Sequence, residues 1–141
     1  MGNVVFHQFG DSVLVAVDIQ GLTPGGHALA VHSVGSCAPD FQAAGDHFEA
    51  VASHRGIIHS NWKRETPYGE HGGDLPNIYA NADGSARADF VTDGFTLRIG
   101  KDHSLFDDDG AAIVIYQEPQ TYGAIETGDA QRVSCGVIQP N

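Results

Sequence analysis

Short runs of alternating apolar and polar residues recur along the chain, separated by glycine-rich turns such as 24–26 and 83–84. Alternation with a period of two is typical of half-buried strands, because successive side chains point to opposite faces of a sheet. No segment keeps a helical period, so the pattern predicts an all-β sandwich or barrel with minimal helix. The expected strands are Val4–Phe9, Val13–Ile19, His27–His32, Ile78–Ala82, Ala86–Val91, Phe95–Ile99, Ala112–Tyr116 and Val133–Ile138.

One stretch, Ser33–Pro76, contains no convincing strand and at most one short helical turn. It is much longer than the connections usually found in compact domains, and long loops of this kind are usually functional or disordered. The stretch also concentrates metal-binding residue types, so we expect a metal ion or a disulfide to order it. These residues are Cys37, His47, His54, His59, His71 and Asp74.

The expected strand His27–His32 carries two histidines with an odd separation. On a continuous strand, such residues point to opposite faces. The residue that shares a face with His32 is Ala30, which can neither bind a metal nor carry a proton. The segment is therefore either a metal-binding strand that lacks part of its ligands or an ordinary strand with a single histidine.

Length and charge narrow the class of protein. The 141 residues fit one domain, 1–141. With 18 Asp and Glu against 7 Lys and Arg, the net charge is -11, which disfavours nucleic acid and anionic membranes as partners and favours cations. No apolar run approaches the ~20 residues of a membrane span, and Met1–Asp11 lacks the basic start and apolar centre of a signal peptide.

The two cysteines, Cys37 and Cys135, lie far apart in the chain. A disulfide closing a loop of about 100 residues would contribute roughly 4 to 5 kcal/mol in the chain-entropy model, and it would suggest an oxidising compartment. Two buried thiols are equally compatible with the composition, so the residues alone leave both states open.

The histidines of the long loop, together with Asp74, offer the imidazole and carboxylate ligands that suit tetrahedral zinc. Surface histidines in loops are also common, so this donor set alone leaves zinc and an unliganded loop open. The acidic run Asp107–Gly110 is most simply a solvated turn before a strand, in preference to a calcium loop.

Four motifs in one order cover nearly the whole chain and resemble the copper-zinc superoxide dismutases in their bacterial form. They are G-L-T-P-G-G-H at 21–27, C-A-P-D-F-Q-A-A-G-D-H-F at 37–48, G-E-H-G-G-D-L-P-N at 69–77 and Q-R-V-S-C-G-V-I at 131–138. The resemblance implies an immunoglobulin-like Greek-key β-barrel with a long metal-binding loop, and an antioxidant oxidoreductase that acts on superoxide.

The resemblance also implies roles for single residues. His47 matches the histidine that bridges zinc and copper, and the other zinc ligands would be His71, Asp74 and either His59, which we favour slightly, or His54. Cys37 and Cys135 match the family disulfide. Two further matches are His27, a supporting histidine that needs no metal, and Arg132, the arginine that steers the superoxide anion.

The copper site departs from the family pattern. Ala30 and Tyr116 stand where two of the four copper histidines are expected, so only His32 and His47 remain. An acidic residue that usually links the copper and zinc histidines is replaced by Gln120. Zinc is therefore the expected cofactor, and copper would bind weakly, with Tyr116 or water completing its ligands.

Three functions follow from this comparison. The preferred one is a zinc-stabilised, superoxide dismutase-like protein whose dismutase activity is lost or weak. The second is an active dismutase that recruits copper through His32, His47 and a substitute ligand. The third is a copper-holding or interaction protein, in which an open site serves transfer in place of turnover.

The resemblance carries two further expectations. Gly2–Phe6 matches the second strand of the family barrel, so the first strand is expected to be absent. Its absence would expose two strand edges, and either the chain is a truncated product or it pairs as a homodimer through these edges. The resemblance and the disulfide together point to a periplasmic or extracellular location.

Overall fold

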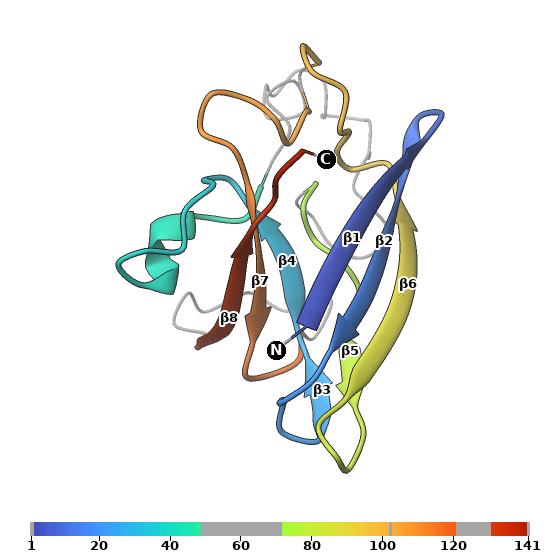
Figure 1. The fold of residues 1–141 in the computed structure, drawn as a ribbon, viewed down its shortest axis with the longest axis vertical. Coiled ribbons are helices and arrows are strands. Elements are labelled where there is room, and N and C mark those ends of the chain that lie inside the picture. Colours follow the sequence, from blue (N-terminus) through green and yellow to red (C-terminus); the bar gives the residue numbers. More distant parts are fainter. Residues whose placement is uncertain (1, 49–71, 102, 121–130, 141) are drawn as a thin grey trace.

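The computed structural model describes residues 2–48, 72–101, 103–120 and 131–140, and within them the fold is almost entirely β (Figure 1). A single short 3₁₀ helix, η1 (Phe41–Ala44), lies in this part of the chain, so the expected low helix content is confirmed there. No helix among these residues is long and apolar enough to cross a membrane. The strands are β1 (Gly2–Phe9), β2 (Ser12–Ile19), β3 (Gly25–His27), β4 (Leu29–His32), β5 (Ile78–Ala80), β6 (Ala86–Thr92), β7 (Ala112–Tyr116) and β8 (Arg132–Val137).

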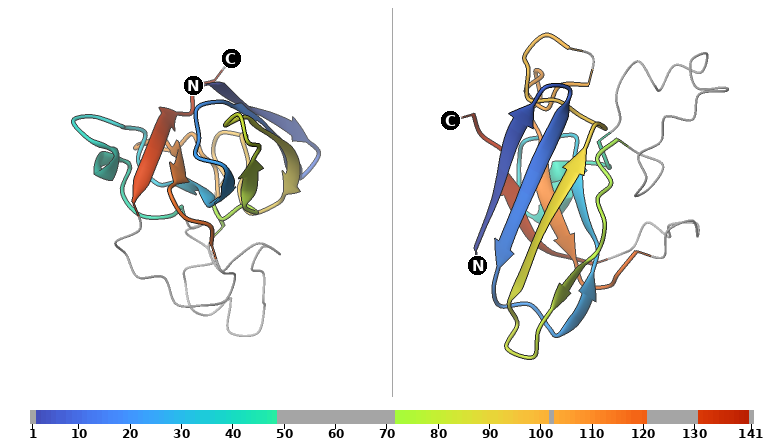
Figure 2. Two further views of the ribbon diagram at one scale, coloured as in Figure 1. Left: turned by 90° about the horizontal axis from the view of Figure 1, so that it is seen from below. Right: turned by 90° about the vertical axis from the view of Figure 1, so that its right-hand side faces the viewer.

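These strands form three antiparallel groups, ordered β1-β2-β6, β3-β5 and β4-β7-β8. In Figures 1 and 2, β1-β2-β6 lies on one side of the molecule and β4-β7-β8 on the other, with β3 and β5 at one end. The alternation along β2 explains this arrangement, because Val13, Val15, Val17 and Ile19 are all buried while the residues between them are more exposed. The predicted all-β barrel or sandwich is confirmed.

The main core lies between the two larger sheets. Val15 and Val17 of β2 pack in the same apolar cluster as Leu29 and Val31 of β4 and Ile115 of β7. Burying each such side chain stabilises the fold by roughly 1.5 to 3 kcal/mol. The opposite face of β4 and β7 is buried too, and it carries the candidate site.

The predicted strand Phe95–Ile99 is wrong. This segment forms one isolated bridge, between Thr96 and Ser104, and no strand. The Gln8 side-chain oxygen accepts hydrogen bonds from the Thr96 hydroxyl (2.9 Å) and the Leu97 amide (2.7 Å). The segment is therefore a loop that packs against Gln8, with Phe95 fully buried. Its side-chain contacts account for the alternation that resembles a strand.

The predicted strand His27–His32 is divided at Ala28. The Ala28 carbonyl accepts from the Tyr116 amide and the Ala28 amide donates to Glu118, both at 2.9 Å, while β3 pairs with β5 and β4 pairs with β7. The alternation of side-chain faces therefore cannot be followed from His27 in β3 across Ala28 into β4. Within β4 the alternation holds, and Ala30 shares a face with His32 as predicted. The two residues lie opposite Val114 and Ala112, on the face away from the main core.

Candidate metal centre

β4 and β7 bring His32 and Tyr116 into direct contact. His32 is fully buried, and its Nδ1 lies 2.8 Å from the carbonyl oxygen of Gly45. Because a carbonyl oxygen only accepts, Nδ1 carries the proton in the neutral ring and Nε2 presents its lone pair. Nε2 accepts from the Tyr116 hydroxyl at 2.7 Å. Burial lowers the pKa of His32 to about 4, with the neighbouring His47 acting in the same direction, so this imidazole is neutral at neutral pH.

His47 lies between two different environments. It forms a backbone bridge with His32, and the ring centroids of the two histidines are 4.7 Å apart. Its Nδ1 lies 2.7 Å from Oδ1 of Asp74, whereas its Nε2 faces the Tyr116 hydroxyl at 3.4 Å. The two nitrogens of one imidazole thus face a carboxylate on one side and a phenol on the other.

A glycine positions Asp74. The amide of Gly73 donates to Phe48 (2.9 Å) and its carbonyl accepts from Val31 (2.8 Å), which holds this segment against β4. A Cβ at Gly73 would collide with the Val31 carbonyl oxygen and with the Phe48 side chain. Asp74 follows directly, bridges to Ala30 and is almost fully buried.

Within the described residues, the site does not form a four-histidine copper centre. Ala30 is buried at 2% exposure on the face of β4 that also carries His32, but it offers only a methyl group. The Tyr116 hydroxyl lies within hydrogen-bond distance of Nε2 of both His32 and His47. Of the residues that the structure describes, two imidazoles, those of His32 and His47, face the Tyr116 hydroxyl, fewer than the four nitrogen ligands that the resemblance predicts.

The described residues on the Nδ1 side of His47 fit a zinc site. His47 Nδ1 and Asp74 Oδ1 are suitable zinc ligands and point at each other from 2.7 Å. The remaining ligand candidates, His54, His59 and His71, lie outside the described residues. Within the described ranges, no three His, Cys, Asp or Glu side chains gather closely enough to hold a metal ion.

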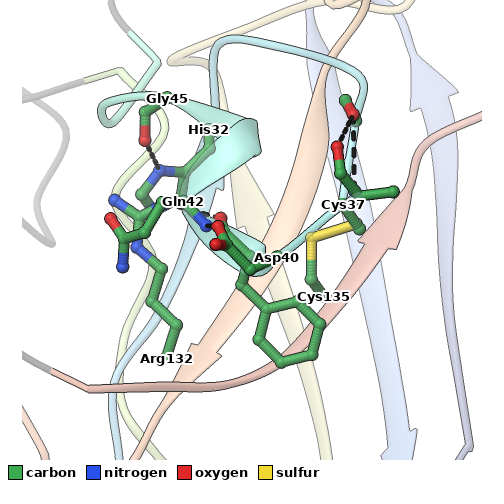
Figure 3. Close-up of a disulfide and its surroundings, with 10 residues drawn as sticks. His32, Cys37, Asp40, Gln42, Gly45, Arg132 and Cys135 are labelled. Atoms are coloured by element: carbon green, nitrogen blue, oxygen red, sulfur yellow. Dashed lines mark hydrogen bonds between the residues drawn. A yellow bond between two sulfur atoms is a disulfide. The ribbon is translucent and has the colours of Figure 1, made fainter.

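The disulfide between Cys37 and Cys135 joins the loop after β4 to β8, with Cα atoms 5.9 Å apart (Figure 3). This confirms the expected pairing and excludes the free thiols that composition left open. Arg132, also on β8, donates from Nη1 to the Phe41 carbonyl at 2.9 Å and so ties η1 to the same sheet. Figure 3 shows Arg132 beside His32, Gln42 and Gly45.

Two supporting residues hold the backbone around Tyr116. His27 lies with Nδ1 2.7 Å from the Tyr116 carbonyl oxygen and with Nε2 2.7 Å from that of Thr23. Asn77 binds both backbone polar groups of Gln120, at 2.8 and 2.9 Å. Sequence reasoning did not single out Asn77, although it closes the motif that contains Asp74. Gly45 and Gly73 were missed as well, because their roles depend on contacts between distant segments.

Comparisons with known proteins agree with this geometry. Residues 1–138 match the model of the copper/zinc superoxide dismutase family. Superoxide dismutase [Cu-Zn] of Caulobacter vibrioides is 37% identical over 141 residues, covering 98% of this chain and 78% of that protein. Superoxide dismutase [Cu-Zn] 1 of Aquifex aeolicus is 32% identical over 142 residues, covering 99% and 80%.

Among solved structures, a superoxide dismutase-like protein from Bacillus subtilis superposes with a TM-score of 0.78 at 26% identity, covering 98% of this chain and 89% of that one. A double mutant of the same protein, with a tyrosine and a proline each replaced by histidine, also gives 0.78, at 28% identity and with 96% and 87% covered. Family model, relatives and fold agree, and the chain belongs to the copper/zinc superoxide dismutase family.

Proposed function

We propose that this chain is a superoxide dismutase-like, zinc-binding protein whose dismutase activity is lost or weak. One observation carries the proposal: the Tyr116 hydroxyl lies between Nε2 of His32 and Nε2 of His47, at 2.7 and 3.4 Å. A copper ion bound by both nitrogens would have to displace this hydroxyl and break its short hydrogen bond to His32.

The chemistry of dismutation explains why this matters. The reaction needs a metal that alternates between two oxidation states, and zinc has no redox chemistry. With Ala30 and Tyr116 in place of two histidines, copper would keep only two imidazoles. Removing a residue that merely supports a ligand typically costs ~10 to 100-fold in affinity or activity, so losing two ligands should cost more.

Zinc binding is proposed for the other side of His47. The ligands would be His47, Asp74, His71 and one of His59 and His54. The support is the 2.7 Å contact between His47 Nδ1 and Asp74 Oδ1, with the Asp74 side chain only 3% exposed. A metal ion could replace the proton between the Asp74 carboxylate and the His47 imidazole and be bound by both groups.

The surroundings of Arg132 support a structural role more than steering of an anion. Its guanidinium donates to the Phe41 carbonyl at 2.9 Å, which fixes η1 against β8. The net charge of -11 repels superoxide at long range. Retention of this arginine is therefore compatible with an inactive protein.

A second candidate function is a copper-holding protein. It is favoured by the convergence of three donor atoms, because Tyr116 Oη lies near both His32 Nε2 and His47 Nε2, and copper(II) has the highest affinity in the divalent series. Copper bound to a phenolate gives a charge-transfer absorption band in the visible range. That band should appear on copper addition and vanish in Tyr116→Phe if this alternative holds.

The proposed partners follow from charge and family. Metal ions are the expected ligands, with superoxide as substrate only if activity remains, and neither nucleic acid nor a membrane is expected as a partner. A periplasmic or extracellular location is proposed from the disulfide and the family. A homodimer through exposed strand edges is also proposed.

The deciding experiment measures metals and activity in the same sample. Protein purified without chelator is analysed for zinc and copper by plasma mass spectrometry, then loaded with copper and assayed for dismutation beside the Caulobacter vibrioides enzyme. We expect about one zinc per chain and activity at least ~100-fold below the control. Activity within a few-fold of the control would show an active dismutase and refute the proposal.

A further inference from the structure

The neighbours of the Tyr116 hydroxyl fix the direction in which it donates. His32 Nδ1 donates to the Gly45 carbonyl at 2.8 Å, a bond drawn in Figure 3, so His32 Nε2 presents a lone pair to the hydroxyl at 2.7 Å. The Asp74 carboxylate also only accepts, so its contact with His47 Nδ1 leaves a lone pair on His47 Nε2, at 3.4 Å from the same hydroxyl. The shorter bond is the one to His32, and the phenol proton therefore points at that ring.

Apolar side chains enclose this pair. Tyr116 is 6% exposed, His32 is fully buried, and the Tyr116 ring packs in a cluster with Ala44, Ala112 and Val114. At 2.7 Å, His32 Nε2 lies within the range of about 2.6 to 3.2 Å over which a base takes a proton directly. The enclosure also keeps the ring from meeting a tyrosine of another molecule. The site thus combines a phenol, a base placed on its hydroxyl and protection from other aromatic rings.

We propose that Tyr116 is a redox-active tyrosine, which gives one electron to a soluble one-electron oxidant while its hydroxyl proton passes to His32 Nε2. The O–H bond of Tyr116 breaks, an N–H bond forms on His32, and the oxidant is reduced by one electron. The products are a neutral phenoxyl radical and an imidazolium, so atoms and charge balance. The step requires no bound metal, so it goes beyond the proposed function and does not depend on the zinc site.

The position of the base makes the oxidation favourable in a buried place. Loss of an electron alone would leave a radical cation among apolar side chains, which is costly. Transfer of the proton in the same step leaves the Tyr116 ring neutral, and the charged His32 ring keeps its bond to the Gly45 carbonyl. Burial lowers the pKa of His32 to about 4, but a phenol that has lost an electron is a much stronger acid than an imidazolium. The proton therefore moves to His32 in spite of its burial.

His47 brings the oxidant close to the phenol. Its ring centroid lies 6.1 Å from that of Tyr116, and 20% of its side chain is exposed. An electron crosses a packed ring without an open channel, so an oxidant that touches His47 does not have to enter the core. The net charge of -11 also attracts cationic oxidants to the protein.

The first test oxidises the full chain with photogenerated tris(bipyridine)ruthenium(III), a cationic one-electron oxidant, and records electron paramagnetic resonance spectra of frozen samples. Wild type should give a persistent phenoxyl signal, and Tyr116→Phe should lose it. The matched control is Tyr79→Phe, which should keep the signal, because Tyr79 is 66% exposed and an exposed phenoxyl radical decays by coupling to another ring.

The same samples are measured with and without chelator. The persistent signal should be unchanged by chelator, because no metal takes part. The proposal is overturned if wild type gives no persistent signal, if Tyr116→Phe keeps it, or if chelator abolishes it.

The second test asks whether His32 takes the proton. The phenoxyl absorption after the flash gives the rate of oxidation, which should be lower in heavy water and about 100-fold lower in His32→Gln, because a positioned base typically contributes at least this factor. The matched control His103→Gln changes a histidine of the loop after β6 and should leave the rate unchanged. The heavy-water comparison uses unmodified protein, so it decides the question even if His32→Gln does not fold. Equal rates in light and heavy water, or a folded His32→Gln that is oxidised as fast as wild type, would overturn the proposal.

Discussion

The two nitrogens of His47 divide the site into two regions with different chemistry. On the Nδ1 side, Asp74 Oδ1 lies at 2.7 Å. On the Nε2 side lies the phenol of Tyr116, with the methyl group of Ala30 on the same face of β4 as His32, and a backbone bridge joins His32 to His47. The strands β4 and β7 that hold both regions pair in regular register, so the fold does not depend on which groups face His47.

The difference shows how the Nε2 side of His47 stays packed without a metal ion. Tyr116 supplies a hydroxyl that satisfies the lone pair of His32 Nε2, and Ala30 fills its position at 2% exposure. A buried imidazole with no partner would cost about 1 to 3 kcal/mol. Tyr116 therefore satisfies His32 with a hydrogen bond at a position where the resemblance predicts a copper ligand.

The change with the largest expected effect removes the disulfide that anchors both regions. The loop from Cys37 to His47 carries Gly45, the partner of His32, so Cys37→Ala with Cys135→Ala should loosen both sides together. We expect a loss of about 4 to 5 kcal/mol in the free energy of unfolding. Urea denaturation measures it, and reduced wild-type protein is the control. A loss below about 1 kcal/mol would contradict this role.

Zinc addition tests the Nδ1 side alone. Zinc at a thousand times its dissociation constant should stabilise the wild-type protein by about 4 kcal/mol, because only the folded state binds it well. In Asp74→Asn the amide oxygen can still accept from His47 Nδ1, but the negative charge is gone, so most of this gain should vanish. Thermal unfolding with and without zinc gives both values. An equal zinc response in the two proteins would remove Asp74 from the site.

The pH dependence of stability tests the Nε2 side. In the metal-free protein the pKa of His32 is lowered by burial from 6.5 to about 4. Between these pH values the unfolded chain binds a proton that the folded chain does not, so the contribution of His32 is complete above pH 6.5 and is lost as pH falls toward 4. We expect a decrease of about 3 kcal/mol over this window. Urea titrations in chelator measure it.

The control for that experiment is His32→Gln, which does not titrate. Its stability should depend less on pH across the same window, even if its stability at pH 7 is lower. Parallel curves for the two proteins would show that another group causes the acid sensitivity.

The smallest expected effect comes from removing one oxygen atom. Tyr116→Phe leaves His32 Nε2 without the donor that lies 2.7 Å away, which should lower stability by about 1 to 2 kcal/mol. Tyr79→Phe is the matched control, because Tyr79 is 66% exposed, and it should change stability by less than about 0.5 kcal/mol. Equal effects in chemical denaturation would mean that the phenol does not satisfy His32.

Most of the fold was predictable from alternation, as in β2, where every second residue is buried. Alternation gives a wrong prediction where tertiary contacts imitate or interrupt a strand. Phe95 and Leu97 alternate because a loop folds around the side chain of Gln8, and β3 ends because the Ala28 carbonyl bonds to Tyr116. Neither contact leaves a local signal in the sequence.

The candidate site divides in the same way. The resemblance predicted the Cys37–Cys135 disulfide, which is confirmed, and it predicts Ala30 and Tyr116 as the replaced copper ligands, which stays a prediction. It did not predict that the Tyr116 hydroxyl lies between the two Nε2 atoms, because that depends on how β7 aligns with β4. The support given by Gly73 and Asn77 likewise arises from backbone contacts across distant segments.

The most direct test of the central claim restores the two missing imidazoles together, as Ala30→His with Tyr116→His, and measures copper affinity and dismutation beside the wild type and each single variant. Position 30 shares a face of β4 with His32, so its new imidazole should point into the same pocket. The account predicts negligible activity in copper-loaded wild type, little in either single variant, and at least ~100-fold tighter copper binding with measurable turnover in the double variant. A double variant that binds copper no better than the wild type would contradict it.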